Sequence, residues 1–101
     1  MIVIFTTLNK KDKALKIGMG LLRAKLIACF NLFPVTSAYW WKGKIISEKE
    51  TMMILKTKVQ NYKKIESYIK KHSDYEIPEV VTVKPSQVSK PYLKWIEKES
   101  A

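Results

Sequence analysis

The chain has 101 residues, 47% of them hydrophobic and 28% charged, which is enough for one domain over residues 1–101 and excludes a disordered tail. Its single cysteine excludes an internal disulfide framework and a zinc site of four cysteines, and no window is apolar enough for a membrane helix. The 19 basic and 9 acidic residues give a formal net charge of +10, which favours anionic partners. Only Arg23 is an arginine, however, and lysine reads base edges poorly. We therefore expect a cytoplasmic protein with no membrane partner and no specific nucleic-acid partner.

The first half of the chain predicts a strand, a helix and a long hairpin. Ile2 to Thr7 is a short apolar run, typical of a strand that is buried on both faces. A core-facing helix follows, because apolar and small residues recur at helical spacing. These are Ala14, Ile17, Gly18, Leu21 and Leu22. Ile27 to Trp41 and Ile45 to Thr57 have β-like compositions, and Lys42-Gly43 between them predicts a tight turn.

Two glycines interrupt the predicted first helix. Gly18 and Gly20 each cost about 1 kcal/mol relative to alanine in a helix. The third glycine of a phosphate-binding loop is missing, and both glycines lie within the helix rather than at a strand-to-helix turn. We therefore predict close packing of this helix against the sheet.

The second half predicts a helix, a short strand and a terminal helix. One stripe of the second helix repeats at helical spacing. It consists of Tyr62, Ile65, Ile69 and His72. Val80 to Val83 predicts a further strand. Ser89 is expected to cap the last helix, with Pro91 in its first turn. The apolar side of that helix is Tyr92, Leu93, Trp95 and Ile96.

This order of elements predicts an α+β fold of the ferredoxin-like type, βαββαβ plus a C-terminal helix. A strand from Ala28 to Trp41 would measure about 46 Å, whereas a domain of this size is only about 35 Å across. Either Pro34 breaks the strand or the hairpin overhangs the domain. An overhang that carries Tyr39, Trp40 and Trp41 would expose an aromatic strand edge that favours association, unless another chain covered it. The sequence therefore predicts an oligomer.

Five segments together resemble one known family. They are Leu26 to Asn31, Ser37 to Ile45, Ile54 to Thr57, His72 to Glu79, and Tyr92 to Trp95. In this order, and over nearly the whole chain, they are similar to the CutA divalent-cation-tolerance proteins. There is one departure, because Ser73-Asp74 stands where the family usually has a single residue between the histidine and the tyrosine. The extra residue could rotate His72 relative to Tyr75.

The resemblance implies a homotrimer whose extended hairpins pair across subunits, with Tyr39, Trp40 and Trp41 at the interface. It also implies a cytoplasmic role in tolerance of copper and other divalent metals. The trimer resembles that of the nitrogen-regulatory signalling proteins, which implies signal transduction through an unidentified signalling partner.

Four side chains are candidate metal ligands: Cys29, His72, Glu76 and Glu79. Cys29 is the only thiolate and would select a soft ion such as Cu(I), although a free cysteine in a strand is more often a small buried hydrophobe. A protonated His72 at a helix end would complement the helix dipole without any metal. We expect no obligatory cofactor. The expected ligand is copper, as Cu(I) or Cu(II), or another divalent metal, at a site shared between subunits.

Two other functions fit the residues. A trimeric sensor could hold a small anionic ligand through Lys56 and neighbouring lysines, and a lysine-driven nucleic-acid binder is the weaker alternative. An enzyme is not expected, because nothing in the sequence places Cys29 beside His72 and the chain has no glycine elbow.

Overall fold

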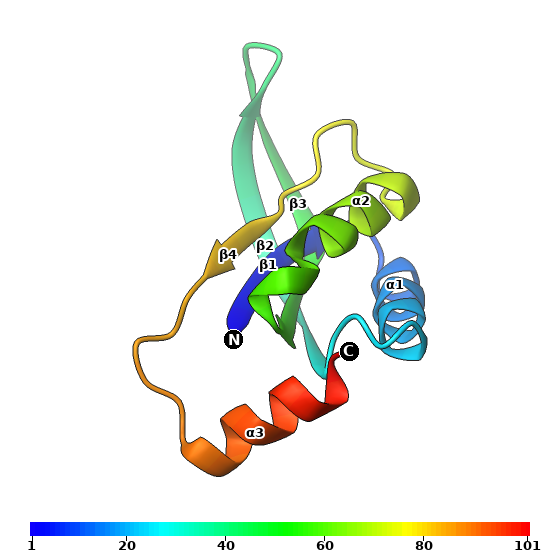
Figure 1. Ribbon diagram of the computed structural model, residues 1–101. Coiled ribbons are helices and arrows are strands. Elements are labelled where there is room, and N and C mark those ends of the chain that lie inside the picture. The colour runs from blue at the N-terminus through cyan, green and yellow to red at the C-terminus, as the bar shows by residue number, and fades with distance from the viewer.

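A computed structural model describes residues 1–101 as a four-stranded antiparallel sheet with two helices on one face (Figure 1). In sheet order, the strands are β2 (Cys29–Trp41), β3 (Lys44–Thr57), β1 (Ile2–Leu8) and β4 (Val81–Val83). The helices are α1 (Lys11–Arg23), the 3-10 turn η1 (Val59–Asn61), α2 (Tyr62–His72) and α3 (Lys90–Glu99). This arrangement confirms the predicted ferredoxin-like fold with a C-terminal helix. No helix combines the length and the apolar character that crossing a membrane requires.

The core lies between the sheet and the α1/α2 layer. Alternate residues of the strands point toward the helices, and those of β1 and β3 are fully buried there. The buried set includes Ile4, Met53, Leu55, Ile17, Leu21, Ile65 and Ile69. Val3 and Phe5, which alternate with the buried residues of β1, are only half-buried. Within one chain, the prediction that this strand is buried on both faces therefore holds only for the face toward the helices.

Gly18 makes the close approach of α1 to the sheet possible. A Cβ atom at this position would lie 2.7 Å from the ring of Phe30 in β2, a distance that real Cβ atoms do not tolerate. The predicted packing role of this glycine is confirmed.

The hairpin overhangs the body of the domain, as Figure 1 shows. The β2–β3 register runs without interruption from Cys29 opposite Lys56 to Trp41 opposite Lys44. Pro34 does not break β2, because β2 is an edge strand and can spare one ladder hydrogen bond. The domain measures 45 × 27 × 21 Å, and its radius of gyration of 14.1 Å exceeds the roughly 13 Å of a compact chain of this length.

The turn and helix ends match most of the sequence predictions. Lys42 and Gly43 have φ angles of 50° and 79°, as a type I′ hairpin turn requires. Ser89 occupies the N-cap position of α3, but its side chain makes no capping hydrogen bond. Ile65 and Ile69 of the predicted stripe on α2 are buried, whereas His72 at the end of the helix is exposed.

Candidate functional site

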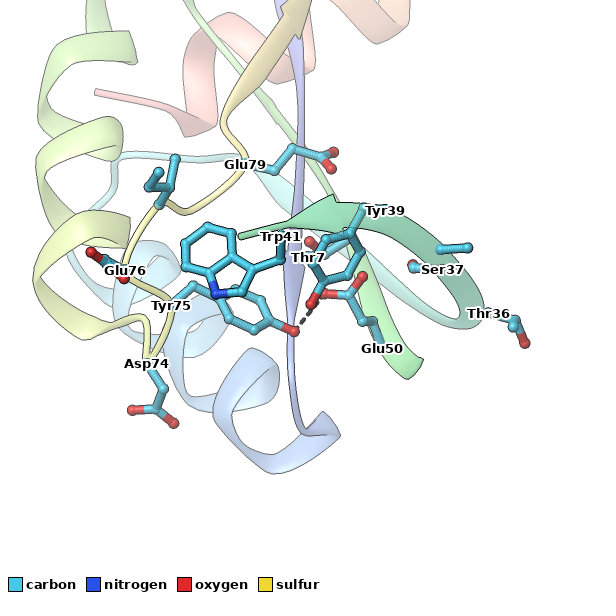
Figure 2. A pocket seen from close by; sticks show the side chains of 12 residues that line it. Thr7, Thr36, Ser37, Tyr39, Trp41, Glu50, Asp74, Tyr75, Glu76 and Glu79 are labelled. Carbon is cyan, nitrogen blue, oxygen red and sulfur yellow. Dashed lines mark hydrogen bonds between the residues drawn. The ribbon is translucent and has the colours of Figure 1, made fainter. Parts of the chain in front are cut away.

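A cavity of about 740 Å³ lies at the base of the hairpin, and we call it the hairpin pocket. Its walls come from the hairpin, from the end of β1 and from the loop between α2 and β4 (Figure 2). The lining residues that carry polar or aromatic groups are Thr7, Thr36, Ser37, Tyr39, Trp41, Glu50, Asp74, Tyr75, Glu76 and Glu79. The pocket forms because β1 ends at Leu8, opposite Thr51. Beyond that point β3 has no neighbour on its second side, and the loop fills part of the space.

A hydrogen bond closes one wall of the pocket. The Tyr75 hydroxyl donates to Glu50 Oε2 over 2.5 Å, and Figure 2 shows the two side chains pointing toward each other from the loop and the hairpin. Burial and this bond to a carboxylate raise the pKa of Tyr75 above its ordinary value. Glu50 itself is only 9% exposed. Tyr75 therefore remains a neutral donor that solvates a buried carboxylate.

A second phenol–carboxylate pair lies further along the hairpin. The Tyr39 hydroxyl donates to Glu48 Oε1 over 2.6 Å at an exposed position. This bond is the main cause that raises the pKa of Tyr39 to about 12. Both tyrosines that line the pocket are thus held as hydrogen-bond donors at neutral pH.

The pocket is acidic, although the chain as a whole is strongly basic. No lysine, arginine or histidine lines it, whereas four carboxylates do. Asp74 pairs with Lys13 over 3.4 Å. The other three, Glu50, Glu76 and Glu79, belong to none of the ion pairs of the chain.

Two of the four candidate metal ligands, Glu76 and Glu79, reach the hairpin pocket. His72 does not line it. Its ring packs 4.3 Å from that of Tyr68, beside a small groove between α1 and α2 that Lys13 and Lys16 also line.

Cys29 lies at the opposite end of β2 from the pocket. It is separated from Trp41 by about 40 Å of extended strand. Its register partner is Lys56, so its side chain points away from α1 and α2. Within one chain, no three His, Cys, Asp or Glu side chains gather closely enough to hold a metal ion.

Lys56 shares the neighbourhood of Cys29. Its ammonium lies 5.8 Å from the centre of the Tyr92 ring, which in turn stacks on Trp95 of α3. Lys56 belongs to none of the three ion pairs of the chain. The structure therefore leaves its ammonium available to an anion.

The predicted interface aromatics point to different sides of the hairpin. Trp41 is half-buried in the hairpin pocket, whereas Trp40, on the other face of β2, is 72% exposed. A second apolar surface, which we call the open sheet face, points away from α1 and α2. By register, it comprises Val3, Phe5, Phe33, Met52, Ile54, Val81 and Val83.

Sequence reasoning missed Glu50 as a pocket residue and its bond to Tyr75. The two residues are 25 positions apart, and a glutamate in a polar stretch of a strand is ordinarily solvated. The only available signal was alternation, since Glu50 lies on the same face of β3 as Met52 and Ile54.

Similar proteins were found for nearly the whole chain. A family model described as "CutA1 divalent ion tolerance protein" matches residues 2–99. The Divalent-cation tolerance protein CutA of Thermotoga maritima is 41% identical over 96 residues, which cover 95% of each chain. The solved structure of the periplasmic divalent cation tolerance protein CutA of Archaeoglobus fulgidus is 31% identical, with a TM-score of 0.97 and 100% coverage of both chains. The PII-like protein CutA of Nostoc sp. PCC 7120 is 28% identical, with a TM-score of 0.93, over 100% of this chain and 98% of that one.

Proposed function

This chain belongs to the CutA1 family of divalent ion tolerance proteins, and from that premise we propose that it acts in tolerance of copper and other divalent metals as a non-enzymatic homotrimer. The observation that carries the proposal is the family match over residues 2–99. Relatives at 41% and 36% identity carry the divalent-cation tolerance description over nearly their whole length.

The exposed surface of a single chain supports assembly. One chain exposes 6861 Å², whereas a compact monomer of this mass would expose about 5,900 Å². Large apolar side chains lie on this excess surface, among them Phe33, Val81 and Val83 of the open sheet face. Covering this face and the hairpin with further copies would remove an apolar patch that monomers rarely carry.

A trimer also suits the separation of the candidate ligands. In a cyclic assembly, each interface joins two different surfaces of the same chain. The Cys29 end of one copy can then meet the Glu76 and Glu79 loop of the next. We propose that metal binds at such a shared site, which one chain does not form alone.

The non-enzymatic role rests on the separation of Cys29, the only thiol nucleophile, from His72, the only histidine base. Cys29 points to the open side of the sheet, whereas His72 lies in the helix layer on the other side.

The PII-like description of the Nostoc relative supports a signalling role, in which the trimer would act on an unidentified partner. We place this role in the cytoplasm, where the unpaired Cys29 would stay reduced. Cell fractionation tests this placement, since the Archaeoglobus relative is described as periplasmic.

A second candidate function follows from Lys56. Its ammonium has no carboxylate partner and lies beside the open sheet face, so a small anion could bind there between subunits. A rise in melting temperature with phosphate that is lost in Lys56→Gln, in protein that binds no copper, would favour this sensor over metal binding.

The metal proposal is tested by anaerobic titration with Cu(I), Cu(II) and Zn(II), followed by mass spectrometry of the intact assembly. We expect Cys29→Ser to abolish Cu(I) binding, because no other thiolate is present. His72→Ala should reduce binding by less, since that side chain lies outside the loop that carries Glu76 and Glu79. Met52→Leu, a change of similar volume, is the control that should leave binding intact. If Cys29→Ser binds Cu(I) as tightly as the parent, Cys29 is not a ligand.

A further inference from the structure

Glu50 is a buried charge without a counter-ion. Its side chain is 9% exposed, its one hydrogen-bond donor is the neutral Tyr75 hydroxyl, and no cation lies within ion-pair distance. Buried carboxylates are ordinarily paired, because removing an ion from water without compensation is costly. Glu76 and Glu79 line the same cavity, also without cationic partners. No cationic side chain lines the hairpin pocket or pairs with these carboxylates.

The walls of the pocket favour one kind of cation. Three aromatic side chains, Tyr39, Trp41 and Tyr75, line it together with the carboxylates. Aromatic faces attract ammonium and guanidinium groups, and tryptophan does so best. The Lys42 ammonium lies 5.7 Å from the centre of the Trp41 ring, within the range of a cation–π contact. Aromatic rings around a cavity of this size suit an organic cation with a carbon chain.

The carboxylates are arranged poorly for a metal ion. Ca²⁺ and Mg²⁺ require several oxygens at about 2.0 to 2.6 Å from one point. Glu50 approaches from the hairpin and Glu76 and Glu79 from the loop (Figure 2), and no three acidic, histidine or cysteine side chains converge. We infer that the hairpin pocket binds an alkylammonium group, with Glu50 as its counter-ion and Trp41 as its aromatic wall. The metal site proposed at Cys29 shares Glu76 and Glu79 with this pocket, whereas Glu50 and Trp41 belong to the pocket alone.

The ammonium can come from two sources. One is a free amine of the diamine class. The other is a lysine side chain of a second copy, since the chain carries 18 lysines besides Arg23 and its hairpin would lie against neighbouring subunits. The chemistry is the same in both cases, so two measurements on the full chain are needed to separate them.

The first measurement is calorimetric titration of the intact protein with cadaverine, whose five-carbon chain ends in primary ammonium groups. We expect saturable binding that weakens at least tenfold in Glu50→Gln and severalfold in Trp41→Phe. Neutral 1-pentanol should not bind. Glu97→Gln, which removes an exposed glutamate of α3 far from the lining residues, is the matched control and should bind like the parent. Should Glu50→Gln fail to fold, the exposed Glu79→Gln, which should weaken binding severalfold, replaces it.

The second measurement is carbodiimide cross-linking of a mixture of isotopically labelled and unlabelled copies. If a second copy supplies the ammonium, added cadaverine should not bind, and amides should form between Glu76 or Glu79 of one copy and a lysine of the other.

The inference is overturned if neither cadaverine binding nor such cross-links are found, or if Glu50→Gln binds cadaverine like the parent. It is also overturned if Zn²⁺ or Mg²⁺ binds more tightly than cadaverine in a Glu50-dependent manner. Loss of Cu(I) binding in Cys29→Ser with unchanged cadaverine binding would separate this pocket from the metal site.

Discussion

The Tyr75 hydroxyl donates a hydrogen bond to the Glu50 carboxylate over 2.5 Å, and this bond joins the loop after α2 to the base of the overhanging hairpin. The two residues come from different segments, and Glu50 lies on β3 one residue past the point where its pairing with β1 ends. The bond both closes the hairpin pocket and keeps a buried carboxylate solvated. Several measurable consequences follow from it and from the surfaces around it.

Tyr75→Phe should destabilise the protein by about 1–3 kcal/mol, because it leaves the buried Glu50 carboxylate without its donor. Tyr39→Phe is the matched control. Its bond to Glu48 is solvent-exposed, so water can replace the lost hydroxyl and the effect should be clearly smaller. Urea unfolding of the two variants measures the difference. Equal losses in both would show that the burial of Glu50 does not matter.

Stability should fall as the pH rises above about 10, the ordinary pKa of tyrosine. The pKa of Tyr39 is raised to about 12 and that of Tyr75 is also raised, so the folded state favours the protonated phenols. Their stabilising contribution is complete below about pH 10 and is lost as the pH rises through the folded-state values. Urea unfolding at several alkaline pH values should show a shallower decline for the double variant Tyr39→Phe/Tyr75→Phe than for the parent. Parallel declines would mean that lysine titration alone explains the loss.

Phe33→Lys should dissociate the assembly, because it places an unpaired charge in the open sheet face. Leu15→Lys tests the same change on the outer side of α1. The two positions are similarly exposed in one chain, at 41% and 46%, yet only Phe33 lies on the surface proposed to be covered. Light scattering should report a trimer for the parent and for Leu15→Lys, and a smaller species for Phe33→Lys. A monomeric parent would contradict the proposed assembly.

Gly18→Ala should lower stability by about 1–3 kcal/mol even though alanine is the better helix former. The new methyl group would lie 2.7 Å from the Phe30 ring, so either α1 or the ring must move. The double variant Gly18→Ala/Phe30→Leu should recover part of the loss, which a double-mutant cycle by thermal unfolding would measure. Additive losses would indicate that Gly18 matters for another reason.

The order and type of the elements were predictable because they depend on local periodicity. Helical spacing located α1 and α2, and the Lys42-Gly43 signal located the turn with its two positive φ angles. Arithmetic left two alternatives for the hairpin, a break at Pro34 or an overhang, since a 13-residue strand is longer than a domain of this size is wide. The uninterrupted β2–β3 register decided for the overhang. The exposure of His72 did not follow from the sequence, because a helical stripe does not show where the sheet beneath the helix ends.

The sequence by itself determined the individual strands, the two covering helices and the segments that carry the family resemblance, because each depends on residues that are near one another in the chain. Only the tertiary structure decided the hairpin pocket, since it depends on where β1 stops relative to β3 and on which loop crosses that gap. It also separated Cys29 from Glu76 and Glu79, which the sequence had grouped by chemical type alone. Residue types specify what a side chain can bind, whereas the register of the strands sets which side chains meet.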